Sequence, residues 1–175
     1  MHLTGSGCRL IGYALLALLM GISLYLFTRD THGVAFLNLL PSAFRPDHPV
    51  SCPFCGSLPT LLHAYAFILL SAVVLRPATR RSLLGLSLFW LTLECLFEFG
   101  QLDGPARQID QLLVDLGDGS DSYAWIGRFF LTGTFDPWDL LGAGVGAAGA
   151  YLTLASGTTE EVRNAQPDYP ETTSD

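Results

Sequence analysis

Residues 83–99 read LLGLSLFWLTLECLFEF, an apolar run in which two carboxylates, Glu94 and Glu98, lie one helical turn apart. An ionised group near the centre of a bilayer costs about 3 kcal/mol or more, so such side chains normally face a bundle interior or a wet cavity. This stretch therefore predicts a membrane protein with a polar site inside its bundle of helices.

The composition of the chain agrees with this interpretation. Half of the 175 residues are hydrophobic and only 14% are charged, which is typical of one compact membrane unit. The formal net charge of −7 comes from acids concentrated in the polar segments. The sequence has no basic stripe interleaved with aromatic residues, so we expect no nucleic-acid partner.

Four apolar segments have lengths close to those of membrane spans, at about residues 10–27, 58–75, 82–99 and 140–155. We therefore predict an all-α integral membrane bundle of four transmembrane helices within residues 1–156, followed by a disordered cytoplasmic tail at 157–175. The first segment follows Arg9 and has a cleaved signal peptide as its alternative. No small-residue cleavage site follows it closely, which favours an uncleaved anchor.

The short loop between the second and third segments fixes the predicted orientation. It contains Arg76, Arg80 and Arg81, and short loops rich in arginine remain on the cytoplasmic side of a membrane. The sequence thus predicts a multi-pass protein of the bacterial inner membrane with both termini in the cytoplasm. Residues 28–57 and 100–138 then lie outside.

The second outer segment carries its own helical pattern. Ile109, Leu112, Leu113 and Leu116 recur at helical spacing among polar residues, which predicts a short amphipathic helix on the membrane surface or on top of the bundle. The apolar stretch 123–131 that follows is predicted to be interfacial or partly re-entrant. We expect neither a metal ion nor a cofactor.

Polar side chains from three predicted spans fall near the outer ends of their helices. The candidate ligand-binding residues are His63, Glu94, Glu98, Gln101, Asp136 and Asp139. At a rise of about 1.5 Å per residue, all of them lie within about 10 Å of the outer interface. Glu94, Glu98 and Gln101 also share one face of the third span. These positions predict a sheltered polar pocket in the outer leaflet.

Each candidate also has a purely structural interpretation. His63 can be a buried histidine that is satisfied by Glu98 or by a backbone carbonyl. Glu94 can simply be protonated, and Asp136 or Asp139 can cap the fourth helix. The sequence leaves these alternatives open.

The fourth segment is rich in small residues. Gly142 and Gly146 form a small-xxx-small pair, which lets helix backbones approach closely in lipid. Packing inside the bundle is the favoured interpretation, and a homo-oligomer formed through these glycines is the alternative.

These residues give the chain a resemblance to the VanZ-like family of small bacterial membrane proteins, over roughly residues 59–151. The shared motifs are a histidine followed by an aromatic four residues later (His63, Phe67), Glu-x-x-Gln at a helix end (Glu98, Gln101), and Asp-x-x-Asp opening a Gly/Ala-rich helix (Asp136, Asp139). The chain departs from the family pattern in three ways. Ser-Leu-Pro-Thr precedes the histidine region, Ala143 stands where an asparagine is usual, and a long segment precedes the Asp-x-x-Asp step.

The resemblance implies a modest set of functions, since some members of the family are linked to glycopeptide-antibiotic resistance and envelope phenotypes without a settled reaction. We therefore expect a pocket that binds a membrane lipid headgroup or a lipid-linked envelope precursor. No catalytic residue is assigned and enzyme activity is left open. If chemistry occurs, His63 and Glu98 are the candidates for an acid/base pair.

A second functional clue is the CPFC motif of Cys52 and Cys55 in the first outer segment. In an oxidising compartment such a pair forms a disulfide that is either structural or redox-active. A zinc knuckle is a third interpretation, but the second knuckle that it requires is missing. A membrane thiol-disulfide redox protein is thus the alternative function.

Overall fold

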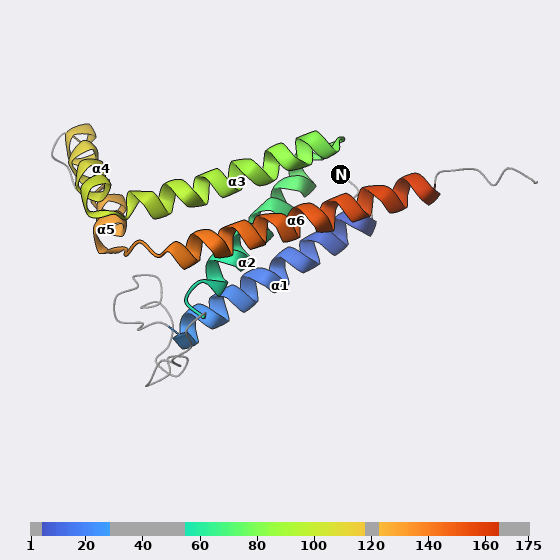
Figure 1. Cartoon of the computed structure of the whole chain (residues 1–175), viewed down its shortest axis with the longest axis horizontal. Helices are drawn as coiled ribbons and strands as arrows, with labels where there is room; N and C mark the ends of the chain where they lie inside the picture. The colour runs from blue at the N-terminus through green and yellow to red at the C-terminus, as the bar shows by residue number, and fades with distance from the viewer. Residues whose placement is uncertain (1–4, 29–54, 118–122, 165–175) are drawn as a thin grey trace, which may run out of the picture.

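A computed structural model of the chain describes residues 5–28, 55–117 and 123–164, and in these ranges the chain is all-helical (Figure 1). The helices are α1 Gly5–Thr28, α2 Leu58–Leu75, α3 Arg80–Gly100, α4 Asp103–Leu116, α5 Ala124–Thr132 and α6 Pro137–Asn164. The all-α prediction is confirmed for these ranges.

Three helices are long and apolar enough to cross a membrane, and they correspond to the first three predicted segments. Their candidate spans are Ser6–Phe27, Leu58–Leu75 and Arg80–Gly100. The fourth predicted segment forms the middle of α6, which is not among these candidates. The α6 helix continues beyond this segment to Asn164. Residues 157–164, which we predicted to be part of a disordered tail, are helical, so that prediction is wrong for them, and 165–175 lie outside the described residues.

The arginine-rich loop makes a tight turn between α2 and α3. Arg76 caps α2 in the left-handed conformation with a φ of 50°, and its N–H donates to the carbonyl of Ala72 at 2.9 Å. Three residues later the Thr79 side chain accepts from the N–H of Ser82 at 3.1 Å and caps α3. These two caps make α2 and α3 an antiparallel pair whose connecting arginines are exposed.

Small residues fill the core of the bundle. The α2 helix packs against α1, α3 and α6. Most of the buried core residues of these helices are alanines, namely Ala14, Ala17, Ala66, Ala72, Ala147 and Ala150. Large side chains such as Leu19, Phe89 and Leu152 are exposed on the outside. A bundle with alanine inside and leucine or phenylalanine outside is suited to hydrocarbon, where close packing rather than hydrophobicity drives helix association.

Two glycines bring α6 against the backbone of α2. A Cβ atom on Gly142 would lie 2.8 Å from the carbonyl oxygen of Ser57. A Cβ atom on Gly146 would collide with the carbonyl oxygen of Leu61. Both glycines of the small-xxx-small pair therefore contact α2 of the same chain, and a homo-oligomer through them stays a prediction.

The segment between α3 and α6 forms two short helices at one end of the bundle. The predicted amphipathic helix is α4, and the stretch 123–131 lies in α5, which packs against α4 (Figure 1). Asp110 of α4 lies against Gly127 of α5. Phe130 of α5 lies over Gly100 and stacks on Phe97 at 5.9 Å, so aromatic packing joins this α4–α5 pair to the end of α3.

Candidate functional site

The end of α3 and the start of α6 meet through Glu98. The side chain of Glu98 is only 8% exposed, and its Oε2 accepts a hydrogen bond from the backbone N–H of Asp136 at 3.2 Å. Because the two residues are far apart in the sequence, this contact is a tertiary one. It satisfies one of the backbone donors at the start of α6, where a carboxylate is also favoured by the helix dipole.

Asp136 itself caps α6. Its Oδ1 accepts from the N–H of Trp138 at 2.9 Å, and its carbonyl oxygen accepts from the N–H of Asp139 at 3.0 Å. Pro137 occupies the first helical position, where its missing N–H costs nothing. The structure thus gives Asp136 the capping role that the sequence left as an alternative.

Two further carboxyl groups complete the site. Asp139 is 5% exposed, and Glu94 is half-buried one turn before Glu98 on α3. Glu94 and Glu98 lie one turn apart on α3, Asp136 and Asp139 lie three residues apart at the start of α6, and the bond from Asp136 to Glu98 joins the two pairs. Glu94, Glu98, Asp136 and Asp139 therefore form one group, called here the acidic cluster, at the junction of α3 and α6.

Gln101 follows the acidic cluster on α3 but faces the link between α5 and α6. Its side chain lies directly against Gly133, and a Cβ atom at that position would stand 2.6 Å from the Gln101 Cδ atom. Gly133 is not among the site residues predicted from the sequence. The only available signal was a glycine just after an apolar helix, which is too common to assign.

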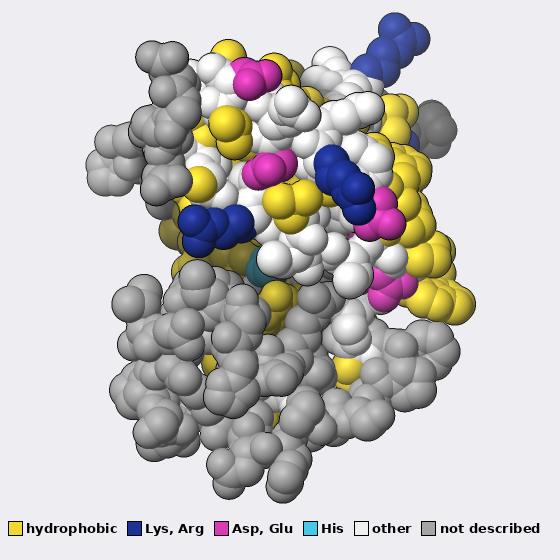
Figure 2. All heavy atoms as spheres, turned by 90° about the vertical axis from the view of Figure 1, so that its left-hand side faces the viewer, with side chains coloured by type: hydrophobic (Ala, Val, Ile, Leu, Met, Phe, Trp, Pro, Cys, Tyr) yellow, Lys and Arg dark blue, Asp and Glu magenta, His cyan; other side chains and the backbone are white. Residues whose placement is uncertain are grey.

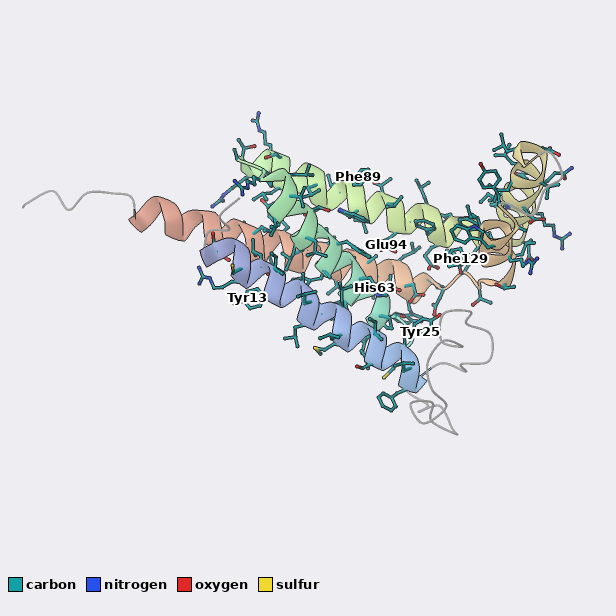
Figure 3. All side chains as sticks on the ribbon, turned by 180° about the vertical axis from the view of Figure 1, so that it is seen from behind. Tyr13, Tyr25, His63, Phe89, Glu94 and Phe129 are labelled. Carbon is teal, nitrogen blue, oxygen red and sulfur yellow. The ribbon has the colours of Figure 1, made fainter. Side chains whose placement is uncertain are left out.

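His63 packs against aromatic rings, and no contact with a carboxylate is seen among the described residues. Its ring stacks with Phe67 at 6.0 Å, and Phe67 stacks with Trp90 of α3 at 5.2 Å. The Nε2 atom faces α1, where a Cβ atom on Gly21 would lie 3.8 Å away. Figure 3 labels His63 on α2 and Glu94 on α3 at a similar level of the bundle. The pairing of His63 with Glu98 stays a prediction.

Trp90, which the sequence analysis also missed, fixes this ring stack. Its indole N–H donates to the Ser71 hydroxyl at 3.0 Å, which joins α3 to α2. The stack of His63, Phe67 and Trp90 therefore joins α2 to α3, and Trp90 lies one turn before Glu94 on α3.

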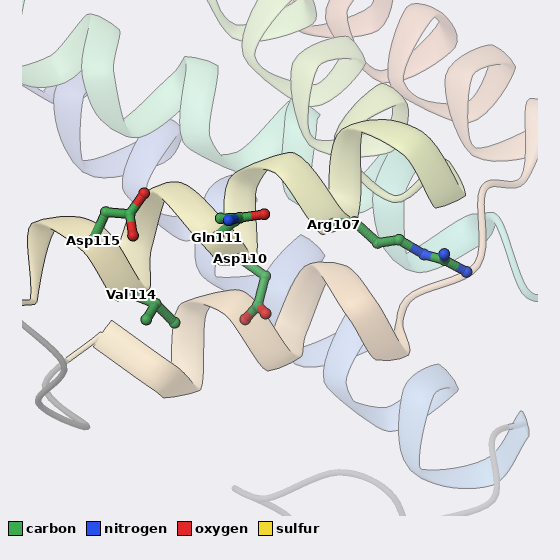
Figure 4. A pocket seen from close by; sticks show the side chains of 5 residues that line it. All are labelled: Arg107, Asp110, Gln111, Val114 and Asp115. Atoms are coloured by element: carbon green, nitrogen blue, oxygen red, sulfur yellow. The ribbon is translucent and has the colours of Figure 1, made fainter.

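A shallow hollow of about 380 Å³ lies on α4, away from the acidic cluster (Figure 4). It is lined by Arg107, Asp110, Gln111, Val114 and Asp115, and it is wide open to its surroundings. The described residues contain no group of three or more His, Cys, Asp or Glu side chains that could hold a metal ion.

The cysteines are in two chemical states. Cys55 is disulfide-bonded, whereas Cys8 and Cys95 carry free thiols. Cys52, the partner that the C-x-x-C spacing predicts, lies outside the described residues. Cys55 lies only a short turn before α2, at the end of the bundle that holds the acidic cluster.

Replacing Asp136 with alanine should destabilise the protein by about 1 kcal/mol, the usual cost of losing an N-cap. Asp136→Asn keeps the side-chain oxygen that accepts from Trp138, so it should stay within a few tenths of the wild type. Thermal unfolding in detergent measures both variants. Equal losses for the two variants would mean that the charge of Asp136, and not its capping oxygen, stabilises α6.

No protein-family model matches the chain, and no curated protein or solved structure is significantly similar to it. The VanZ-like resemblance therefore stays a prediction that depends on the quoted motifs alone.

Proposed function

We propose that the chain crosses a bacterial inner membrane four times, with α6 as the fourth span and both termini in the cytoplasm. The α6 helix has 28 residues, which is more than the roughly 20 that a bilayer core requires. It packs along α2 and α3, which are both long and apolar enough to cross a membrane. Its outer face exposes Leu141, Val145 and Leu152, as a lipid-facing surface would.

We also propose that the acidic cluster binds the polar headgroup of a membrane lipid or of a lipid-linked envelope precursor. The observation that carries this proposal is the convergence of four carboxyl groups from α3 and α6 at one end of an apolar bundle. Two of these groups, Glu98 and Asp139, are more than nine-tenths buried. Buried acidic side chains at membrane depth are costly, and they commonly mark a binding site or a pathway.

The chemistry of the acidic cluster restricts the headgroup. Carboxylates accept hydrogen bonds and attract positive charge, so they favour headgroups that carry an amine or several hydroxyl groups. Gln101 follows on the next turn of α3 and adds an amide in this proposal. The VanZ-like motifs add a link to the cell envelope, and His63 completes the pocket if it turns toward Glu98.

The test is to compare lipids that co-purify with the wild type, Glu98→Gln and Ser87→Ala. Glutamine keeps the shape of Glu98 and an oxygen for the Asp136 N–H, but it removes the charge. A hydrogen bond to a charged group contributes about 1.5–3 kcal/mol, so its loss should weaken lipid binding at least about tenfold. The amount of the specific lipid that co-purifies with Glu98→Gln should fall by a similar factor. Ser87 is buried on the same helix and bonds only within it, so Ser87→Ala is the matched control. Mass spectrometry identifies the lipids.

The same comparison can refute the proposal. If Glu98→Gln retains the same lipids as the wild type, the acidic cluster only caps α6. The redox alternative gains support if, in addition, trapping of free thiols in cells yields a mixed disulfide between Cys55 and another protein. The disulfide at Cys55 is the observation that keeps this alternative open.

A further inference from the structure

The α4–α5 pair exposes large apolar side chains on faces that no described helix covers. On α4 these are Leu112 and Leu116, which are 57% and 67% exposed. On α5 they are Trp125 and Phe129, which are 71% and 50% exposed. The two residues of each pair are four positions apart, so each pair forms a continuous apolar strip along its helix.

Polar side chains flank both apolar strips, about 60–140° round each helix at about 100° per residue. Gln111 and Asp115 of α4 are exposed, as is Arg128 of α5. Figure 2 looks onto this end of the molecule, where acidic and basic side chains lie among hydrophobic ones on the face toward the viewer and further hydrophobic side chains line one edge. The apolar strips of the α4–α5 pair are therefore bordered by charged side chains, several of which face away from the bundle.

The apolar faces continue the surface that the spans present to lipid. Only two residues, Gln101 and Leu102, separate α3 from α4. The ring of Phe129 meets Phe97 edge to face at 6.1 Å, and Phe97 is itself exposed on α3. An apolar surface thus runs without a break from the candidate span α3 to the exposed strip of α5.

The α4–α5 pair also has the orientation that a helix in the membrane interface requires. In Figure 1, α4 lies across the end of α3 rather than along it, and it projects to the side of the bundle. A helix in that position is roughly parallel to the membrane plane when α3 crosses the bilayer. Trp125 is the residue type that is enriched at the membrane–water interface.

We propose that the α4–α5 pair lies in the headgroup layer, with Leu112, Leu116, Trp125 and Phe129 inserted into the lipid leaflet at this end of the bundle. Its occupant is the leaflet of the membrane that α3 crosses, and its role is to hold the segment between α3 and α6 against the bilayer beside the acidic cluster. The proposal depends on the membrane-spanning position of α3 and is independent of headgroup binding by Glu98.

Spin labels on the α4–α5 pair in reconstituted vesicles test this position. In a Cys8→Ser, Cys95→Ser background, one label is placed at Leu116→Cys or Trp125→Cys and a control label at Gln111→Cys. Gln111 is exposed and lies about 140° round α4 from Leu116, at about 100° per residue. Oxygen partitions into lipid, whereas a nickel chelate stays in water. Labels at 116 and 125 should therefore collide more often with oxygen than with the nickel chelate. The label at 111 should show the reverse order.

A second measurement leaves the apolar faces unaltered. The chain has three tryptophans, so Trp90→Phe with Trp138→Phe leaves Trp125 as the only fluorophore. Lipids brominated near the headgroup should quench it strongly, and aqueous iodide should quench it weakly. If iodide quenches Trp125 as fully as it quenches free tryptophan, or if labels at 116 and 125 follow the label at 111, the α4–α5 pair lies in water and the proposal is wrong. Retention of lipid by Glu98 is measured separately and is unaffected by either outcome.

Discussion

Replacing Gly146 with alanine lowers the thermal unfolding temperature of the protein by about 5 °C, because the new methyl group cannot fit between α6 and α2. Its Cβ atom would collide with the carbonyl oxygen of Leu61 and would lie 3.1 Å from the carbonyl carbon. These are backbone atoms, which cannot rotate aside as a side chain can. The two helices must therefore separate along their whole contact, at a cost of about 2 kcal/mol.

The same helix supplies a matched control two residues away. A Cβ atom on Gly144 would meet nothing within 4 Å, so Gly144→Ala adds a methyl group in open space. Alanine favours a helix over glycine by about 1 kcal/mol, so this variant should unfold at the wild-type temperature or above it. Thermal unfolding followed by circular dichroism in detergent compares the two variants.

The experiment also addresses the homo-oligomer that the small-xxx-small pair allows. If Gly146→Ala leaves the unfolding temperature unchanged but converts a dimer to a monomer in size-exclusion chromatography with light scattering, the glycine acts between chains. That result would contradict the contact of Gly146 with Leu61 within one chain.

Replacing Phe130 with alanine releases the α4–α5 pair from the end of α3. Phe130 is buried over Gly100 and forms ring contacts with Phe97 at 5.9 Å and with Phe129 at 5.2 Å. Loss of a buried phenylalanine costs about 3–5 kcal/mol in a packed core, which corresponds to at least about a hundredfold change in a local opening equilibrium. Hydrogen exchange in residues 103–132 should therefore become faster by that factor, whereas exchange in α2 should not change.

Leu131 is the matched control for Phe130. It is the next residue on α5 and is exposed, so Leu131→Ala should leave hydrogen exchange within a fewfold of the wild type. Equal acceleration in both variants would mean that the intrinsic stability of α5, and not its docking on α3, governs opening of this segment.

The acidic cluster shows how far a single sequence can predict a site. The two glutamates of α3 were predictable because carboxylates inside an apolar run are conspicuous. The step from Asp136 to Asp139 was visible because it opens the last helix. The hydrogen bond from the Asp136 backbone to Glu98 was not predictable, since it joins two distant segments whose approach depends on how α3 and α6 pack.

His63 is the instructive contrast. Its depth in α2 was predicted from the hydropathy pattern, but depth says nothing of the direction in which the ring points. The structure stacks the ring on Phe67 and turns Nε2 toward Gly21. The neighbour that the ring faces belongs to α1, so its direction depends on how α1 and α2 pack and not on the sequence of α2 alone.

The sequence by itself determined where the apolar helices lie, because length, hydropathy and capping are local properties. Leu58–Leu75 is the same in prediction and structure, and α3 differs from its prediction only by a turn or less at each end. Only the tertiary structure decided which faces pack. Apart from the carboxylate-bearing face of α3, these helices are mostly apolar all round, so hydropathy does not distinguish a lipid-facing side from a buried one. That choice depends on the fit of small residues across distant segments, such as Gly146 on Leu61, and this fit exists only in the folded chain.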